Sequence, residues 1–326
     1  MKDCGKRILA SLLTGYVFFF YGEIVFWATP DREGMGGVEL IITWMVYSFF
    51  AYVFLCVVSL FKVRSIWAVF LAGAFFGWYE EGIVLQTTHG TPDNPLPMSI
   101  SWTGLAWHAL IDALVGWFLV RKTLDQKSVP KTILLACSIG AFYGFWSIFW
   151  WTEPPESMKL LIDAGRMDLV FVHFSIFSLA ASAILIFAYW LYDRIKPFAF
   201  KPGKFEVWSL IVLTVVYFCL VTAPASPIAL AVIPVFMGIT LMALNRNRLV
   251  EKAPDAIDCF DSNVSLTNYL CLLFMPLTAI TIYFVAFTGD ILLQTNLAVY
   301  YSLSVIGFFL WVFSVVTILR KPIASA

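Results

Sequence analysis

Long runs of apolar residues, separated by short polar connections, dominate this sequence. A helix needs about 20 apolar residues to cross a hydrocarbon core of roughly 30 Å, and ten runs approach that length. The pattern predicts an all-α, polytopic integral membrane protein with about ten transmembrane helices. The predicted spans are residues 8–29, 38–61, 65–85, 102–120, 132–151, 169–191, 207–221, 227–244, 266–287 and 297–319. The seventh and eighth runs are short, so residues 207–244 fit either two spans or a re-entrant pair.

The composition agrees with a membrane protein. Hydrophobic residues make up 61% of the 326 residues and charged residues 13%, whereas soluble domains have about 45–50% apolar and about 25% charged residues. This excess excludes a soluble enzyme, because even large soluble domains bury only about 75% of their chain surface. The formal net charge is zero, so no overall field attracts nucleic acid. We expect the lipid bilayer and a small-molecule or lipid substrate as partners.

Lysine and arginine residues collect in alternate connections between the predicted spans. In the ten-span arrangement 18 of the 21 fall on one side of the membrane, and only Arg32, Lys159 and Arg166 fall on the other. Cytoplasmic loops of membrane proteins carry such an excess of positive charge. The bias predicts that the N- and C-termini are cytoplasmic, that the loops at Pro92 and Pro155 are external, and that the protein lies in the plasma membrane.

Two heptapeptides, residues 73–79 and 140–146, match each other. Each contains Gly-x-x-x-Gly, a spacing that lets two helix backbones approach closely, and each precedes a lone histidine in the next span, His108 or His173. The match predicts a parallel internal repeat of helical hairpins, residues 65–122 and 131–194. These hairpins belong to a six-helix N-terminal half, residues 1–196, and residues 197–326 form a four-helix scaffold half.

Ionisable residues inside the predicted spans are few. They are Glu23, Glu80, Glu81, His108, Asp112 and His173. A charge in the bilayer centre costs about 2.5–3.5 kcal/mol on insertion scales. At about 1.5 Å per residue, four different spans place such a group at a similar depth near the outer boundary. We therefore predict a polar chamber that opens outward, with Glu81, His108 and Asp112 inside it and Glu80 and His173 at its rim.

Several chemistries fit these residues. His108 and Asp112 are four residues apart, so they share one helical face. With Glu81 they could bind a substrate, relay protons or hold a divalent metal, since Zn²⁺ accepts histidine nitrogen and carboxylate oxygen. Glu81 could also act as a general base with His108 as its partner. A further interpretation is a polar network that only fixes helix packing. The sequence assigns no catalytic residue.

The pair Glu80-Glu81, followed by His108-x-x-x-Asp112, resembles part of the CAAX-protease and bacteriocin-processing membrane proteins. In that family a Glu-Glu-x-x-x-Arg motif and later histidines form an intramembrane hydrolase site. The sequence departs from the pattern at Leu85, Gly104 and Phe177, where the family has Arg, Phe and Asn. We predict a protein that binds or transports a small or lipidic substrate, with a metal-assisted intramembrane hydrolase as the alternative.

The outer connection at residues 87–97 contains no lysine or arginine and is rich in proline and glycine. Such a composition favours turns over a continuous helix. We predict that this connection forms a shaped lid over the chamber. His89 lies within it and is expected to face water.

Overall fold

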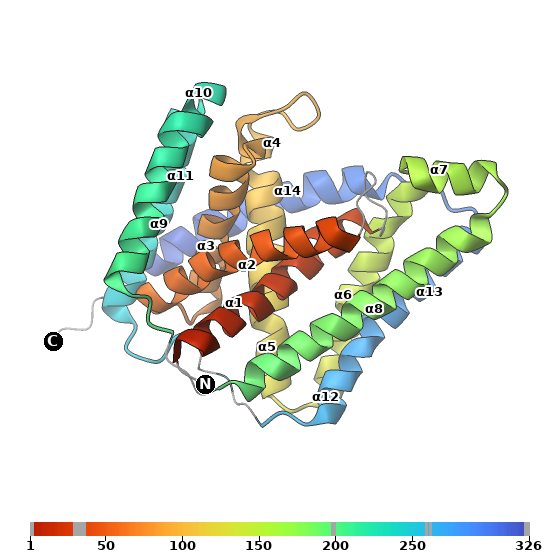
Figure 1. Ribbon diagram of the computed structural model, residues 1–326, viewed down its shortest axis with the longest axis horizontal. Coiled ribbons are helices and arrows are strands. Elements are labelled where there is room, and N and C mark those ends of the chain that lie inside the picture. The colour runs from red at the N-terminus through yellow and green to blue at the C-terminus, as the bar shows by residue number, and fades with distance from the viewer. Residues whose placement is uncertain (1–2, 29–36, 197–199, 258–259, 261–262, 323–326) are drawn as a thin grey trace.

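The computed structural model describes residues 3–28, 37–196, 200–257, 260 and 263–322. Within these residues the chain is helical and contains no strand, which confirms the predicted all-α class (Figure 1). The first half of the chain forms α1 (Asp3–Phe19), η1 (Phe20–Val25), α2 (Gly37–Leu60), α3 (Ile66–Gly77), η3 (Trp78–Val84), η4 (Thr87–His89), α4 (Met98–Ser101), η5 (Trp102–Leu119), α5 (Val120–Asp125), α6 (Val129–Ser147) and η6 (Ile148–Trp151).

The second half continues the same pattern of long helices and short connections. It forms α7 (Glu156–Asp163), α8 (Met167–Arg194), α9 (Lys204–Tyr217), η7 (Phe218–Thr222), α10 (Ala223–Ala225), α11 (Ala229–Val250), α12 (Leu266–Leu270), η8 (Cys271–Leu273), α13 (Phe274–Thr288) and α14 (Thr295–Leu319). Elements η1, η3, η5 and η7 are π-helical, with wider turns than an α-helix.

Nine helices in the described part of the chain are long and apolar enough to cross a membrane. The helix of α3 and η3 occupies the remaining predicted span, and its Glu80 and Glu81 make it less apolar than the others. Residues 207–244 belong to two separate helices, Lys204–Ala225 and Ala229–Val250. Each has 22 residues, which is long enough to cross a membrane. Thr29, at the end of the first predicted span, lies outside the described residues, as do Lys2 and Arg32 from the charge count.

Local sequence explains where several helices begin. The Ser65 side chain accepts a hydrogen bond from the Ala68 N–H at 3.3 Å and starts α3. Pro130 lies in the first turn of α6, where its missing N–H leaves no hydrogen bond unmade. Pro224 and Pro227 lie at the connection between α9 and α11, where proline, which has no N–H to donate, interrupts the helical hydrogen bonds.

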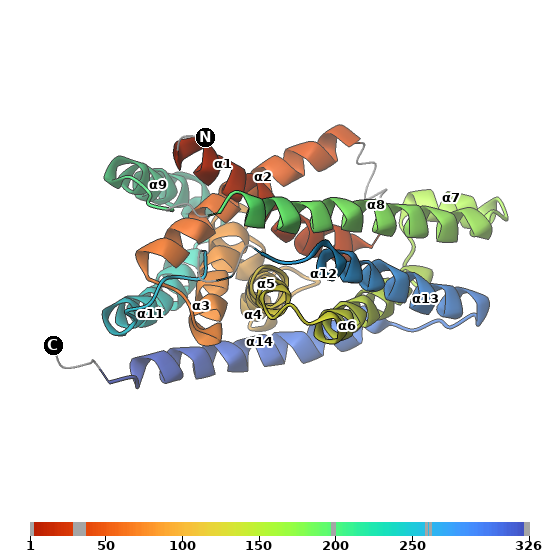
Figure 2. The ribbon, with the colours of Figure 1, turned by 90° about the horizontal axis from the view of Figure 1, so that it is seen from below.

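The helices form a central group with two flanks. At the centre, α3 packs along η5 and α1 packs along α2. Helices α9 and α11 form one flank, while α6, α8 and α13 form the other, as Figures 1 and 2 show. Helix α14 crosses the centre and contacts α3, η5 and α11. C-terminal helices therefore pack directly on N-terminal ones, and the division at residues 196 and 197 stays a prediction.

Glycines lie at the closest helix crossings. A Cβ on Gly73 would lie 2.7 Å from the Ala113 Cβ, and one on Gly77 would overlap the Gly104 carbonyl oxygen. This pair therefore joins α3 to η5, as expected for the first hairpin. Gly140 and Gly144 instead meet α13, at Met275, Thr278, Ala279 and Ile282. Because the second pair does not contact α8, the internal repeat stays a prediction from the sequence.

Candidate functional site

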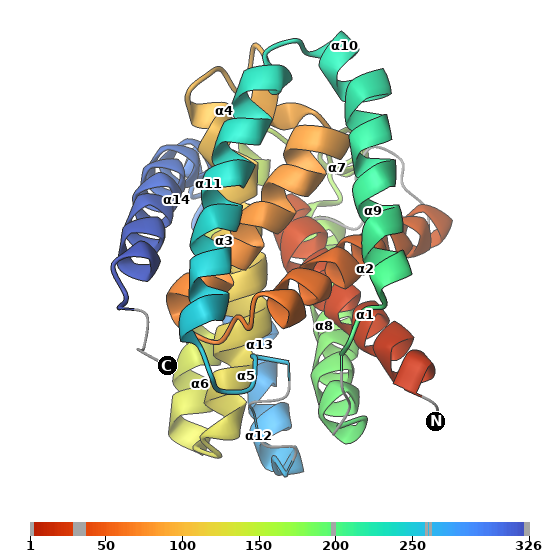
Figure 3. The same cartoon turned by 90° about the vertical axis from the view of Figure 1, so that its left-hand side faces the viewer.

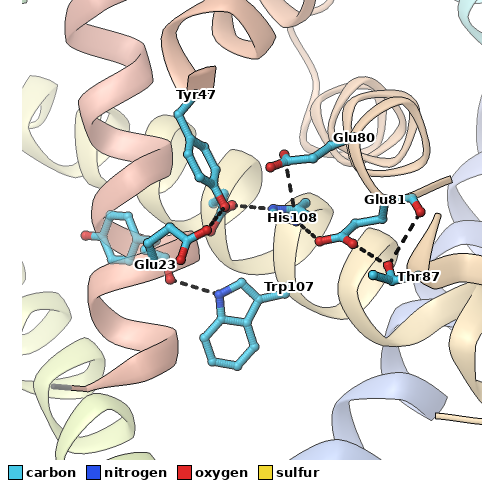
Figure 4. A network of polar contacts seen from close by, with 9 residues as sticks. Glu23, Tyr47, Glu80, Glu81, Thr87, Trp107 and His108 are labelled. Atoms are coloured by element: carbon cyan, nitrogen blue, oxygen red, sulfur yellow. Dashed lines mark hydrogen bonds and ion pairs between the residues drawn. The ribbon is translucent and has the colours of Figure 1, made fainter. Parts of the chain in front are cut away.

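Four helical segments bring polar side chains together in the interior. Segment η3 supplies Glu80 and Glu81, and η5 supplies His108 and Asp112. Helix α2 adds Tyr47, while η1 adds Glu23 beside it (Figure 4). The close approach of α3 and η5 at the glycines positions these groups, because a bulky side chain there would hold the two helices apart. We call Glu80, Glu81, His108 and Asp112 the His108 cluster.

The imidazole of His108 lies between two carboxylates. Its Nδ1 is 2.7 Å from Asp112 Oδ2, and its Nε2 is 2.9 Å from Glu81 Oε1. Glu80 Oε2 approaches the same Nε2 at 3.8 Å. All four residues of the cluster are buried. The structure therefore places three carboxylates around one ring, away from water and lipid.

These contacts restrict where protons are held. A neutral imidazole has one N–H and cannot donate to two carboxylates. Either His108 carries two protons, or one of its two partners holds a proton and donates it to the ring. A doubly protonated ring would still balance only one of the three carboxylates. Since Glu80 Oε2 and Asp112 Oδ1 are buried without a hydrogen-bond partner among the described residues, and a buried unpaired charge is costly, the site favours bound protons or a bound cation.

The cluster has a more exposed end near the connection at residues 87–97. Both oxygens of the Glu81 carboxylate are engaged, one by His108 and the other by the Thr87 hydroxyl, which donates to it. The Glu81 side chain keeps 9% of its surface exposed, against 0% for Asp112. Thr87 itself is half-buried. Glu81, together with Thr87, is therefore the part of the site nearest the surface.

At the other end, Asp112 lies close to a tyrosine and a further carboxylate. A Cβ on Gly22 would lie 3.0 Å from Asp112 Oδ2 and 2.8 Å from the Tyr47 hydroxyl oxygen. The Tyr47 hydroxyl donates to Glu23 Oε1 at 3.2 Å. Nearby, the Trp107 indole N–H donates to the Tyr21 carbonyl oxygen at 2.8 Å and joins η5 to η1. Glu23 therefore borders the cluster through Tyr47.

The helices widen into π-turns where they carry the cluster. The Leu85 N–H donates to the Glu80 carbonyl oxygen at 2.8 Å, five residues earlier. The Val120 N–H bonds to the Val115 carbonyl in the same way at the end of η5. Glu23 also lies on a π-helical segment. π-Turns are rare overall but occur often at functional sites. The depths predicted from the sequence rest on α-helical spacing, so they do not include this widening.

The remaining predicted residues lie elsewhere. His173 is exposed on α8, and Figure 4 shows the contacts of the cluster without it. Glu81 and Asp112 contact opposite nitrogens of His108. The two carboxylates therefore point at the histidine ring, and the three side chains share no common centre where a metal ion could lie. Within the described part of the chain, no group of three or more His, Cys, Asp or Glu side chains is arranged to hold a metal ion. The described residues therefore give no support for a metal ion held by Glu81, His108 and Asp112 together.

The sequence does not predict the part that Tyr47 and Thr87 play in the site, or the burial of His89. Tyr47 and Thr87 gave no signal, because a tyrosine in an apolar run and a threonine in a loop are ordinary. His89 was expected to face water, yet it is buried, and its Nε2 donates to the Gly82 carbonyl oxygen at 2.6 Å. Burial lowers the pKa of the His89 imidazole from its ordinary value, although the Gly82 hydrogen bond opposes this effect.

Comparisons with protein-family models, with curated proteins and with solved structures each find no match. The resemblance to the CAAX-protease family therefore rests on the few residues already named. The function has to be argued from the cluster itself.

Proposed function

We propose that this multi-pass membrane protein binds or transports a small or lipidic substrate, and that the His108 cluster gains or loses a proton as it does so. The observation that supports this most directly is the buried imidazole held between two carboxylates with a third nearby. Ionisable groups inside membrane proteins commonly mark substrate pathways and proton relays. The unpartnered oxygens of Glu80 and Asp112 add capacity for a proton or a cationic group.

The contacts permit proton transfer across the ring. A proton on Glu81 Oε1 can pass to His108 Nε2 while the Nδ1 proton passes to Asp112 Oδ2. The ring then remains neutral with its proton on the other nitrogen, and one proton has moved from the more exposed carboxyl to the fully buried one. Tyr47 and Glu23 lie beyond Asp112. We propose that Thr87 and Glu81 form the entrance from the outer side.

An intramembrane hydrolase is the alternative. It would need a carboxylate that is free to activate water and that water can reach. Both oxygens of Glu81 are engaged by other side chains, and the unpartnered oxygens of Glu80 and Asp112 belong to fully buried side chains. A metal-assisted version would also need converging ligands. The contacts therefore favour proton exchange over hydrolysis.

The orientation proposal rests on the distribution of lysine and arginine. We propose cytoplasmic termini and a plasma-membrane location, with the loops at Pro92 and Pro155 outside. Single cysteines placed in these loops, in a chain without its native cysteines, should react with an impermeant maleimide added outside intact cells. Reaction only after the cells are opened would reverse the orientation and move the proposed entrance to the cytoplasmic side.

Proton exchange can be measured without knowing the substrate. We expect the purified protein to take up protons at a buried carboxyl group as the pH is lowered, visible in infrared difference spectra. The E81Q and H108Q variants should lose or shift this signal, while H173Q should keep it. Identical spectra for E81Q, H108Q and the parent would contradict proton exchange at the cluster.

Transport is tested in proteoliposomes with an imposed inward proton gradient. The probes are labelled organic acids, organic cations, short peptides and a fluorescent phospholipid. Uptake that depends on the gradient, and that E81Q abolishes while H173Q does not, supports the proposal. Release of cleavage products from the peptide or lipid probe, lost in E81Q, would instead support the hydrolase.

A further inference from the structure

An apolar cavity of about 600 Å³ lies among α2, α3, η3, α9 and α11. Aliphatic and aromatic side chains form most of its wall. Its main polar feature is a pair of hydroxyls, those of Tyr79 and Thr214, which lie 3.1 Å apart and bond to each other. The cavity volume falls in the range of about 300–1,000 Å³ typical of ligand pockets.

Helix α9 has polar contacts with the rest of the protein near its start, at Thr214 and beyond its end. Near its start, Arg7 pairs with Glu206 at 2.8 Å, and the Tyr52 hydroxyl donates to the same carboxylate at 3.0 Å. Beyond its end, the Thr222 hydroxyl donates to the Ile83 carbonyl oxygen at 2.6 Å. No residue of α9 is buried. The middle of the helix therefore faces the cavity instead of packing tightly against α2 and α3, which it flanks in Figure 3.

Exposed basic residues lie close in the chain to segments that line this cavity. Leu60, Phe61 and Val207 line it where α2 ends and α9 begins. Lys62 and Lys204, which adjoin these positions in the chain, are both exposed. Arg248, in the last turn of α11, is exposed as well. Basic pockets between membrane-spanning helices bind anionic lipid headgroups.

We propose that the cavity holds an acyl chain of an anionic phospholipid from the surrounding bilayer. The walls belong to membrane-spanning helices, so lipid hydrocarbon is the apolar ligand present at that depth. The lining offers almost no hydrogen bonding, which suits a hydrocarbon chain better than a polar metabolite. The headgroup lies at the end near Lys62 and Lys204. The cavity is distinct from the His108 cluster, so this proposal does not rest on the proposed function.

Gly238 offers a direct way to fill the cavity. It lines the cavity, and a Cβ built on it meets no atom within 4 Å. Glycine inside a helix is also less favourable than other residues by about 1 kcal/mol, so a larger side chain should not unfold the protein. G238W therefore places an indole where the acyl chain would lie. V235W is the matched control, because Val235 is 53% exposed on the same helix and does not line the cavity.

The test uses the full chain in nanodiscs that contain phosphatidylglycerol with a photoactivatable acyl chain. After irradiation, labelled peptides are mapped by mass spectrometry. We expect labelling of α9 and α11 peptides that line the cavity, reduced at least fivefold in G238W and unchanged in V235W. Phosphatidylcholine with the same acyl chain should label these peptides severalfold less, and a K62Q/K204Q variant should remove that preference.

Two results would overturn the proposal. Equal labelling of the cavity peptides in G238W and the parent would show that the chain binds only the outer surface. Equal labelling by phosphatidylcholine and phosphatidylglycerol would show that the site does not select an anionic headgroup. Thermal unfolding of each variant in detergent verifies that a loss of labelling does not reflect a loss of fold.

Discussion

The two Gly-x-x-x-Gly segments, residues 73–77 and 140–144, share their spacing but not their surroundings. The first packs α3 against η5, its neighbour in the predicted hairpin, and the second packs α6 against α13. After the first, the helix continues as a π-turn with Glu80 and Glu81. At the equivalent positions the second has Ser147 and Ile148, and it tightens into the 3₁₀ turn η6.

The difference separates two roles that the sequence presents together. Glycine spacing explains how closely two helices approach, but it does not select the partner helix. The two histidines differ in burial. His108 is buried among carboxylates, whereas His173, its counterpart in the second segment, is exposed on α8. The position equivalent to Asp112 is Phe177, so the second segment lacks a second polar partner.

Replacement of the second glycine in each segment should give the largest effects. Both glycines face backbone atoms of the neighbouring helix. A Cβ on Gly77 would overlap the Gly104 carbonyl oxygen, whereas a Cβ on Gly144 would lie 2.8 Å from the Ala279 carbonyl oxygen, a less severe overlap. Overpacking typically costs about 1–3 kcal/mol and occasionally more. We expect G77L to lose about 3 kcal/mol or more and G144L about 1–3 kcal/mol in denaturant unfolding.

G238L is the control for this pair, since space is open at Gly238. Equal, small losses in G77L and G144L would show that neither crossing is as close as the structure places it. Preserved infrared signals from the His108 cluster in G144L, with loss in G77L, would show that only the first crossing supports the site.

Replacement of the two histidines should give the next largest difference between the two segments. H108Q leaves three buried carboxylates around a group that cannot be protonated, and unpaired buried charges are costly. We expect a loss of about 2–3 kcal/mol in unfolding free energy and loss of proton uptake. H173Q should change stability by less than about 0.5 kcal/mol, as for other exposed positions. Similar losses in both variants would contradict the contrast between the two histidines.

The sequence predicts the helices more completely than the arrangement of the site. Long apolar runs predicted the helices well, because crossing a bilayer demands a fixed length. The cost of burying charge indicated that Glu81, His108 and Asp112 belong inside. Depth along a span, however, carries no information about which way a helix faces after packing, so His173 was placed at the same level yet lies on an exposed face.

Other features depend on contacts between distant segments. Tyr47 reaches the site because α2 packs beside α1, and the predicted spans alone do not give that neighbour. The π-turns at η3 and η5 change the register within single helices, and no apolar pattern marks them.

Neutralising one carboxylate should have a smaller effect than removing the histidine. E80Q keeps the shape of the Glu80 side chain and removes a charge from a site that already holds three carboxylates. A buried charge without a hydrogen-bond partner is costly, so removing it should not destabilise the fold. We expect E80Q to change the unfolding free energy by no more than about 1 kcal/mol, with stabilisation greatest at high pH. A loss as large as that of H108Q would show that the Glu80 carboxylate is fully paired in the fold.

The smallest expected effect concerns the connections that follow the two segments. His89 is buried after η3 with a lowered pKa caused by burial, whereas residues 152–166, after η6, contain no histidine. When residues 87–97 open locally, His89 becomes exposed and binds a proton more readily than in the folded connection. The folded connection is therefore most stable above the ordinary histidine pKa of about 6.5, and its stability decreases as the pH falls below that value. We expect amide exchange at residues 87–97 to speed up between about pH 7.5 and pH 5.5, after correction for intrinsic rates. H89N should remove this dependence, and residues 152–166 should lack it in the parent protein. A dependence that persists in H89N would place the proton on another group.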